Sequence, residues 1–254
     1  MSAPIAVQLY TLWDHLDKDY RGTLTKLAEM GYVGIETCGY SHGVPVKDAV
    51  TLFKDLGLTL CSAHVGMPVG DNVQKVLDEA AAAGCKRVIS GFGADGFKTA
   101  DAIKATCDMF NQAAENVAKA GLTFGVHNHW WEYEKLADGT PAYKVMLQHV
   151  DPRVFFELDV YWIQTGGCNP AEVVAEFGKR APLLHIKDGP CQHNQPMTPV
   201  GEGKVDVPAV VKAAKSNAEW MIVELDTCAI DKLEAVGKSY QYLVGNKLAR
   251  GRQP

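Results

Sequence analysis

Three absences in the 254-residue sequence each exclude a class of protein. No apolar run approaches the roughly 20 residues that a membrane-spanning helix needs. Lysine and arginine form no clustered basic stretch, and the formal net charge of −5 argues against a nucleic-acid partner. The N-terminus has neither the charged region nor the cleavage site of a signal peptide. We therefore expect a cytoplasmic chain with no membrane or nucleic-acid partner.

The cysteines lack the pattern of a disulfide framework or of a zinc-thiolate site. The seven are odd in number and scattered, with no CxxC pair, which favours a reducing cytoplasm. Cys61, Cys85 and Cys107 lie in apolar or helical runs, where a thiol usually packs as a small hydrophobic group. We expect these three in the core and assign no cysteine a nucleophilic role.

The sequence does contain a regular alternation of short β-branched runs and amphipathic helical stretches. "IAVQLYT" is followed by "RGTLTKLAEMG", and the same rhythm continues to "EWMIVELD" and the helical stretch after it. Consecutive βαβ units force parallel strands and right-handed crossovers. Eight units in about 250 residues match the size of a closed (β/α)8 barrel. No linker interrupts the rhythm, so we predict one α/β barrel domain over residues 1–254.

A doubly wound open sheet is the alternative fold. It would be expected to carry a phosphate-binding glycine loop after an early strand, with an acidic residue about 20 positions later at a strand end. The segment "SGFGADGF" at residues 90–97 is glycine-rich, but we do not interpret it as this fingerprint, since no such acidic residue follows it. The closed barrel is therefore favoured.

Polar residues gather at the predicted strand ends, where barrel enzymes place their chemistry. So many titratable groups on one rim would be costly if merely buried, because unpaired charges are disfavoured away from water. A shared metal ion would explain them together. The strand-end residues are Gln8, Tyr10, Glu36, His64, His127, Asn128, His129, Glu132, Glu157, Asp159, His185, Lys187, Asp188, Glu224 and Asp226.

Each of these residues, taken alone, also has a structural explanation. Asp159 could cap a helix, His185 could be a satisfied core histidine, and Glu224 could pair with a lysine. Side chains alternate along a strand, so residues two positions apart, such as His185 and Lys187, point to the same face. A metal ion and a lysine can therefore share the barrel mouth. An oxygen-rich site with one imidazole suits Mn²⁺, Mg²⁺ or Co²⁺ better than zinc.

Five segments resemble one known family. "LTFGVHNHWWEYE", "VFFELDVYWIQTGGCNP", "LLHIKDG", "PVGEGKVD" and "WMIVELD" are similar to the sugar phosphate isomerase/epimerase family, the xylose isomerase-like TIM barrels. The resemblance spans nearly the whole chain and is specific for the superfamily, whose substrates range over sugars, ketosugars, inososes and small hydroxy-ketones. It implies a divalent metal cofactor and a sugar or keto-sugar substrate, and it leaves a homo-oligomer open.

The resemblance also implies a set of metal ligands. Three of them fall on Asp159, His185 and Glu224. The first ligand falls on Glu132, as in the branch of the family with an HNH motif, and His129 or His127 is the alternative because the glutamate of the epimerase branch is missing from this strand.

The remaining implied roles are catalytic and substrate-binding. Glu132, Glu224 and Lys187 are the expected catalytic residues, the two glutamates as candidate bases and the lysine tuning their basicity. The residues expected to line the substrate pocket are Tyr10, Glu36, His64, His127, Asn128, His129 and Trp130.

These residues suggest proton transfer next to a sugar carbonyl. A chelated divalent ion would stabilise the enediolate formed when a carboxylate removes the α-proton. Return of the proton gives an isomerase or epimerase, our leading hypothesis. Loss of a β leaving group gives the alternative, a lyase or dehydratase acting on a keto-sugar, 3-keto-glycoside or inosose. A non-catalytic sugar-binding barrel and an endonuclease IV-like repair enzyme are less favoured, since the ligand positions are filled and a basic groove is lacking.

The segment "GPCQHNQPMTPVGEGKVD" is long for a loop between a strand and a helix. Long loops on the catalytic face of a barrel commonly act as lids or binding loops. We expect Asp206 to cap the helix that follows.

Overall fold

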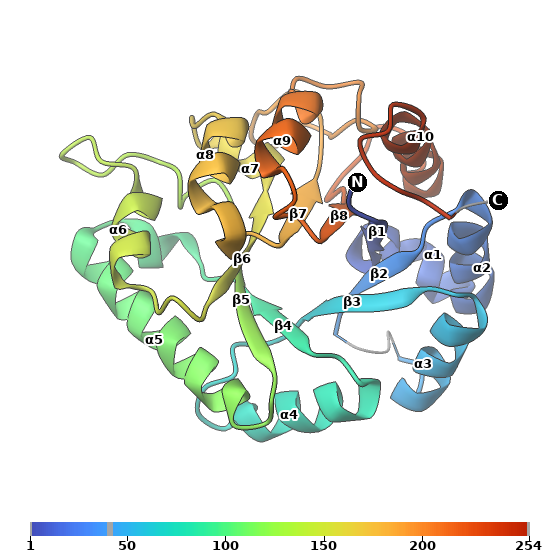
Figure 1. Ribbon diagram of the computed structural model, residues 1–254, viewed down its shortest axis with the longest axis horizontal. Coiled ribbons are helices and arrows are strands. Elements are labelled where there is room, and N and C mark those ends of the chain that lie inside the picture. Colours follow the sequence, from blue (N-terminus) through green and yellow to red (C-terminus); the bar gives the residue numbers. More distant parts are fainter. Residues whose placement is uncertain (1, 40–42, 253–254) are drawn as a thin grey trace.

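Eight parallel strands close into one barrel in the computed structural model, which describes residues 2–39 and 43–252 (Figure 1). Each strand pairs with its neighbours in chain order, and β8 closes the barrel against β1. The predicted (β/α)8 architecture is confirmed. The strands are β1 Ile5–Gln8, β2 Gly34–Cys38, β3 Thr59–His64, β4 Arg87–Ser90, β5 Thr123–His127, β6 Phe155–Asp159, β7 Leu183–Ile186 and β8 Trp220–Val223.

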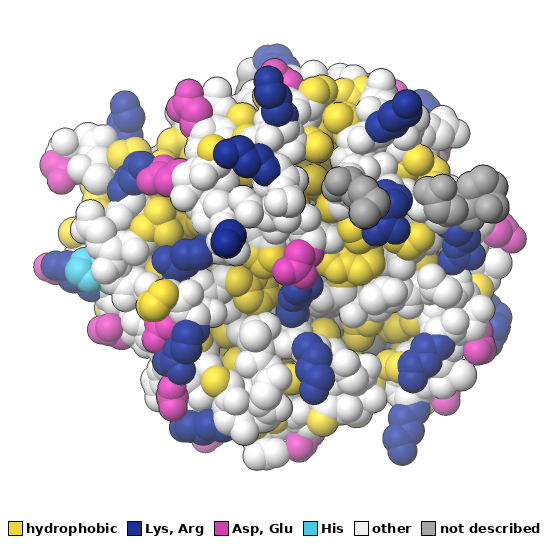
Figure 2. All heavy atoms as spheres, viewed as in Figure 1, with side chains coloured by type: hydrophobic (Ala, Val, Ile, Leu, Met, Phe, Trp, Pro, Cys, Tyr) yellow, Lys and Arg dark blue, Asp and Glu magenta, His cyan; other side chains and the backbone are white. Residues whose placement is uncertain are grey.

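Helices surround the barrel (Figure 1). They are η1 Leu9–Leu12, α1 Trp13–Lys18, α2 Tyr20–Met30, α3 Val46–Asp55, α4 Asn72–Ala83, η2 Ala94–Phe97, α5 Ala100–Ala118, α6 Ala142–His149, α7 Val160–Thr165, α8 Pro170–Phe177, η3 Gly178–Arg180, α9 Val207–Ala214 and α10 Lys232–Gly245, where η marks a 3₁₀ helix. In the described ranges, no helix combines the length and apolarity needed to cross a membrane. The face shown in Figure 2 carries basic and acidic side chains interspersed.

Local sequence explains these helices, and α5 is the longest example. It begins where the Thr99 side chain accepts a hydrogen bond from the backbone of Ala102, a favourable N-cap. Ile103, Phe110 and Val117 repeat every seven residues, so they share one buried face packed on the barrel. The three cysteines expected in the core, Cys61, Cys85 and Cys107, are buried as predicted.

The glycine-rich segment at residues 90–97 connects β4 to α5 and includes η2. Its glycines at positions 91, 93 and 96 have the GxGxxG spacing. The closed barrel topology nevertheless excludes a doubly wound dinucleotide-binding sheet, so the spacing has no such meaning here.

The barrel interior begins with a layer of apolar side chains separate from the main core. Phe155 and Trp220 pack against this layer, and two glycines make room for their rings. A Cβ atom on Gly125 would lie 2.3 Å from the Phe155 ring, and one on Gly34 would lie 2.3 Å from the Trp220 ring. Small residues at these positions therefore let the large rings fill the barrel floor. The layer consists of Ala6, Cys61, Ile89, Leu183 and Ile222.

A polar layer follows the apolar one along the same strands. Because side chains alternate along a strand, residues two positions further on point to the same side. Two positions after Ala6, Phe155, Leu183 and Ile222 the chain has polar residues, and all four are buried. The strands therefore carry their charged groups above the apolar floor, at the C-terminal mouth. These residues are Gln8, Glu157, His185 and Glu224.

A β-bulge in β3 adds Ser62 to this layer, next to Glu36 of β2. The pairing of β2 with β3 runs from Ile35 with Leu60 to Glu36 with Ser62, so Cys61 is an extra residue. Cys61 joins the apolar floor, while the Ser62 hydroxyl donates to the Glu36 carboxylate at 2.5 Å. The bulge therefore turns two consecutive side chains toward the barrel interior.

Asp188 anchors the long loop between β7 and α9. Its carboxylate is 1% exposed and accepts hydrogen bonds from four backbone N–H groups, those of Gly189, Gly201, Gly203 and Val205, at 2.8–3.1 Å. The two ends of the loop are thus tied to a single buried charge at the end of β7.

Replacing Asp188 by asparagine should destabilise the fold by at least about 2 kcal/mol, because the amide cannot accept all four N–H groups and each buried donor left unpaired is costly. Urea unfolding would measure the loss. Asp206→Asn is the matched control: Asp206 caps α9 as predicted, accepting from the Ala209 N–H at 3.0 Å, and asparagine caps about as well. Equal stability of the Asp188 variant and the wild type would contradict this role.

Candidate metal centre

Four buried side chains converge at the C-terminal mouth of the barrel. His127 ends β5, Asp159 ends β6, His185 lies in β7, and Glu224 follows β8. One potential ligand atom from each lies within 4.8 Å of the others. Asp159 and His185 are paired neighbours in the sheet, so the strand register itself brings them together.

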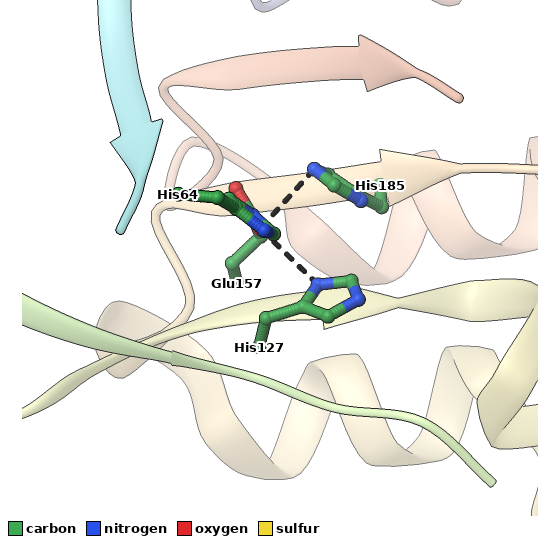
Figure 3. Close-up of side chains that lie close together, drawn as sticks. All are labelled: His64, His127, Glu157 and His185. Carbon is green, nitrogen blue, oxygen red and sulfur yellow. Dashed lines mark hydrogen bonds and ion pairs between the residues drawn. The ribbon is translucent and has the colours of Figure 1, made fainter. Parts of the chain in front are cut away.

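A second group lies next to the first and shares its two histidines. It joins His64 and Glu157 to His127 and His185, and Figure 3 shows the three imidazoles gathered around the Glu157 carboxylate. Glu157 Oε2 is 2.5 Å from His64 Nε2, 3.1 Å from His127 Nδ1 and 3.1 Å from His185 Nε2. Two possible metal positions therefore overlap.

The three imidazoles differ in protonation. Burial lowers the pKa of His64, but Glu36 and Glu157 outweigh burial and raise it to about 10, so His64 pairs with them as a cation. Burial also lowers the pKa of His185, which both groups share, but Glu157, Glu224 and Glu36 hold it well above its ordinary value. Burial, together with the neighbouring cations, lowers the pKa of His127 well below its usual value, which leaves a neutral imidazole. A metal ion must displace the proton of a charged imidazole, and the group with Asp159 and Glu224 requires this of His185 alone, so it is the better candidate.

Glu36 lies beneath this group. It was predicted to line the substrate pocket, but its side chain is completely buried and supports His185 instead. Its carboxylate is 2.6 Å from His185 Nε2 and accepts hydrogen bonds from Gln8 Nε2 at 2.7 Å and from the Ser62 hydroxyl. Ligating histidines commonly have their second ring nitrogen held by a carboxylate in this way.

Lys187 contacts the group that contains Asp159 and Glu224. Its ammonium is 1% exposed and lies 3.0 Å from Asp159 Oδ2, 2.8 Å from Glu224 Oε2 and 2.9 Å from Asp226 Oδ2. Burial lowers the pKa of Lys187, but the three carboxylates outweigh burial and hold it well above its ordinary value. In return, Lys187 and His185 overcome the effect of burial and lower the pKa of Glu224.

Asp159 divides its two oxygens between two tasks. Oδ1 accepts from the backbone N–H groups of Tyr161 and Trp162, each at 3.0 Å, and so caps α7. Oδ2 faces Lys187 and has no hydrogen-bond partner among the described residues. Burial raises the pKa of Asp159 to about 6. The helix cap fixes the carboxylate in place and leaves its second oxygen free to bind a metal ion.

Unpaired buried atoms provide a test of whether the residues fit a metal ion. Within the described part of the chain, Asp159 Oδ2, Glu224 Oε2, and Nδ1 of both His127 and His185 lack a hydrogen-bond partner. Each of the four lies at ion-pair distance from a charged group, yet without hydrogen-bond geometry. Buried polar atoms of this kind are costly unless something pairs with them. Two imidazoles and two carboxylates that converge in this way fit a divalent cation.

Glu132 belongs to neither group of described residues, although the sequence favoured it as the first ligand. His127, one of the two alternatives, lies beside Asp159, His185 and Glu224 instead. Glu132 is completely buried, and its Oε2 accepts from the His129 N–H at 2.9 Å, while Oε1 has no partner among the described residues. Burial raises the pKa of Glu132 to about 8. It is a carboxyl group that can hold a proton near neutral pH.

Asn128 and His129, expected to contact substrate, have structural contacts here. The Asn128 amide accepts from the Asp159 N–H at 3.0 Å and donates to the Asp159 carbonyl at 3.3 Å, which holds the start of α7 against β5. The His129 ring stacks on Trp131 with centroids 4.3 Å apart.

Trp130 forms part of an aromatic wall above the metal centre. Its ring centroid lies 4.9 Å from that of Trp162 and 4.8 Å from that of His193, which belongs to the long loop after β7. Trp162 also lies 5.7 Å from the Lys187 ammonium. Tyr10 is 43% exposed on η1, outside the buried cluster.

Some of these residues carried no role in the sequence analysis. Glu157 and Gln8 were recognised as strand-end residues only, and their spacing of two from floor residues was the available signal. Ser62 enters the site through the β-bulge, Trp162 from α7 and His193 from the loop after β7, and the sequence pattern predicted none of these contacts.

Comparison with known proteins defines the class of the chain. The model of the xylose isomerase-like TIM barrel family matches residues 24–243, so the chain belongs to that family, as the sequence motifs predicted. A sugar phosphate isomerase/epimerase from Parabacteroides distasonis has a similar structure, with a TM-score of 0.85, 27% identity and coverage of 98% of this chain and 100% of that chain. No curated protein matches the chain.

More distant structures share the fold alone. An L-ribulose 3-epimerase superposes with a TM-score of 0.70 at 16% identity, with 97% of this chain and 94% of that chain covered. The IOLI protein, whose structure contains a zinc atom, superposes with a TM-score of 0.71 at 15% identity, with 95% and 97% covered.

Glu36→Gln should weaken binding of Mn²⁺ by about 10–100-fold, the usual cost of losing a carboxylate that orients a ligating histidine. The fold should persist, since glutamine has the same shape. Equilibrium titration with Mn²⁺ would measure the change, and Glu219→Gln, an exposed glutamate just before β8, is the control. Unaltered Mn²⁺ affinity in the Glu36 variant would show that this carboxylate does not orient His185.

Proposed function

We propose that the chain is a divalent-metal-dependent sugar isomerase or epimerase. The observation that supports this most strongly is the convergence of His127, Asp159, His185 and Glu224 at the barrel mouth, with the Lys187 ammonium at ion-pair distance from two of them. Membership of the xylose isomerase-like family and the likeness to a sugar phosphate isomerase/epimerase support the substrate class.

These four residues are the proposed ligands, in place of the set containing Glu132. When bound, the ion would draw electron density from a sugar carbonyl and its neighbouring hydroxyl, which acidifies the adjacent C–H bond. The sequence suggested one imidazole and hence Mn²⁺, Mg²⁺ or Co²⁺. A second imidazole makes the set richer in nitrogen, which favours Mn²⁺, Co²⁺ or Zn²⁺ over Mg²⁺.

Glu132 is the proposed base. Its Oε2 is fixed by the His129 N–H, and its Oε1 is unpaired among the described residues. Glu224 was the other candidate, but its contacts with Lys187 and His185 stabilise the carboxylate and make it a weak base. A group that takes and returns a proton works best when its pKa lies near the working pH, a condition that Glu132 meets.

Lys187 would stabilise the oxygen on which negative charge develops. Its buried ammonium is already held by Asp159 and Glu224, so little reorganisation is needed when a substrate oxygen arrives. Glu132 acting alone returns the proton to the neighbouring carbon, which gives aldose–ketose isomerisation. Epimerisation requires a second proton donor on the opposite face of the carbon, a role for the Lys187 ammonium, because Glu224 is held as a carboxylate.

Elimination is the second candidate. A lyase or dehydratase must give a proton to the departing oxygen, and the buried ammonium of Lys187 is a proton donor at the centre of the site. On a keto-sugar, 3-keto-glycoside or inosose, the same residues would then remove a β-substituent.

One experiment tests the shared step. Metal-reconstituted protein is incubated in D₂O with ketoses, aldoses, inososes and 3-keto-glycosides, and the sugars are examined by NMR and mass spectrometry. Deuterium at the carbon next to the carbonyl reports proton removal, and the product separates isomerisation, epimerisation and elimination. If no sugar in the panel gains deuterium or changes, the proposed chemistry is wrong.

His185→Ala and Glu132→Gln should both abolish turnover, for different reasons. The first removes a ligand, so bound metal should fall, and excess Mn²⁺ should restore part of the activity by mass action. The second leaves the four ligands intact, so metal should stay bound while exchange falls about 10²–10⁴-fold, the usual cost of losing a general base. Metal analysis and deuterium exchange measure both effects.

His149→Ala, an exposed histidine on α6, and Glu219→Gln are the controls for these two variants and should behave like the wild type. Wild-type exchange by Glu132→Gln would move the role of base to Glu224. Full metal occupancy in His185→Ala would remove His185 from the ligand set.

A further inference from the structure

A cavity of about 520 Å³ adjoins the metal centre. It lies between the ends of β2 and β3 and the first turns of α4, with α1 on its other side. Its volume is within the range of about 300–1,000 Å³ typical of pockets for drug-sized ligands. The side chains that carry the argument below are Trp13, Cys38, His64, Asn72, Lys75 and Glu79.

The cavity and the polar layer next to the metal centre share one residue, His64. His64 lines the cavity, and its Nε2 is also 2.5 Å from Glu157 Oε2 in the polar layer. Cys38, at the end of β2, lines the cavity as well. The cavity therefore begins where the polar layer ends, at the His64 ring.

The charges on the lining favour an uncharged ligand. Lys75 and Glu79 are one helical turn apart on α4 and offset each other, and the charge of His64 is offset by Glu36 and Glu157, so the lining has no excess positive charge for a phosphate. Asn72 is held in place by a hydrogen bond from its amide to the Met67 carbonyl at 2.9 Å. The polar groups thus suit hydroxyls better than anions.

The opposite wall is aromatic. Trp13, the first residue of α1, is 42% exposed and lines the cavity, and Tyr10 lies beside it with ring centroids 6.4 Å apart. A sugar ring has flat faces of C–H groups, which pack on an indole, and an edge of hydroxyls, which need polar partners. An aromatic wall facing polar side chains matches both surfaces of such a ring.

We propose that this cavity is a subsite for a second, uncharged sugar ring, linked to the sugar that reacts at the metal centre. The inference rests on the proposed function and narrows its substrate class from a free monosaccharide to a glycoside or disaccharide. Trp13 supplies the stacking surface, Asn72, Lys75 and Glu79 bind hydroxyls, and His64 lies at the junction between the two rings.

The test compares ketoses with one and two rings. Binding of D-fructose and of turanose, maltulose, lactulose and isomaltulose to Mn²⁺-loaded protein is measured by calorimetry. We expect at least one two-ring ketose to bind about tenfold or more tightly than fructose, the effect of one well-packed aromatic contact. Trp13→Ala should remove that gain and leave fructose binding unchanged, whereas Trp13→Phe should keep part of it.

Two further variants test the polar wall. Lys75→Ala should weaken two-ring binding alone, and Lys104→Ala, an exposed lysine on α5, is its matched control. Thermal unfolding and fructose binding of each variant establish that the fold and the inner site are intact, and Lys75→Ala serves in place of Trp13→Ala if the latter does not fold.

The subsite is overturned if no two-ring ketose binds more tightly than fructose, or if the gain survives in both Trp13→Ala and Lys75→Ala. Tighter binding of glucose 6-phosphate or adenosine than of every two-ring ketose would overturn the neutral-sugar assignment. If no sugar exchanges deuterium while the gain still depends on Trp13, the proposed chemistry fails and the subsite stands.

Discussion

The rest of the site depends on how the barrel neutralises carboxylates that it has removed from water. Glu36, Glu157, Asp159 and Glu224 are all buried inside one ring of strands. Buried charges are tolerated only when they are paired, so each carboxylate faces an imidazole or the ammonium of Lys187. The pairing rigidifies the mouth of the barrel, and a divalent cation there would bind the Asp159 and Glu224 oxygens that have no hydrogen-bond partner among the described residues.

Much of the fold and part of the site could be predicted from the sequence because both follow from strand periodicity. The alternation of strands and helices predicted the barrel, and barrel topology alone brings Asp159, His185 and Glu224 to one rim. The sequence could not predict how deep in the barrel each side chain lies. Glu36 and Tyr10 were both predicted at the ends of early strands, yet Glu36 lies within β2 under the ligands and Tyr10 lies on η1 and is exposed. Depth depends on a bulge and on the tilt of strands, and neither leaves a clear mark in sequence.

A structural role for a single residue is compatible with a role in binding a metal ion. Asp159 does cap a helix, and Glu224 does pair with a lysine. His185 does have partners within the barrel, Glu36 among them. A carboxylate has two oxygens and an imidazole two nitrogens, so one atom can anchor the side chain while the other faces the centre. The same division explains why the ligands keep their places through contacts within the chain.

The apolar floor of the barrel affects whether a proton removed from the substrate exchanges with solvent. Ala6, Leu183 and Ile222 have no exposed surface, and the Phe155 and Trp220 rings pack against them. Water that reaches the polar layer therefore comes from the open end of the barrel. A substrate that covers this opening also shields the hydrogen held on a carboxyl group beneath it. A hydrogen isotope removed from the substrate can either return to the sugar or exchange with solvent. The ratio of these two outcomes would then measure how long the sugar stays bound.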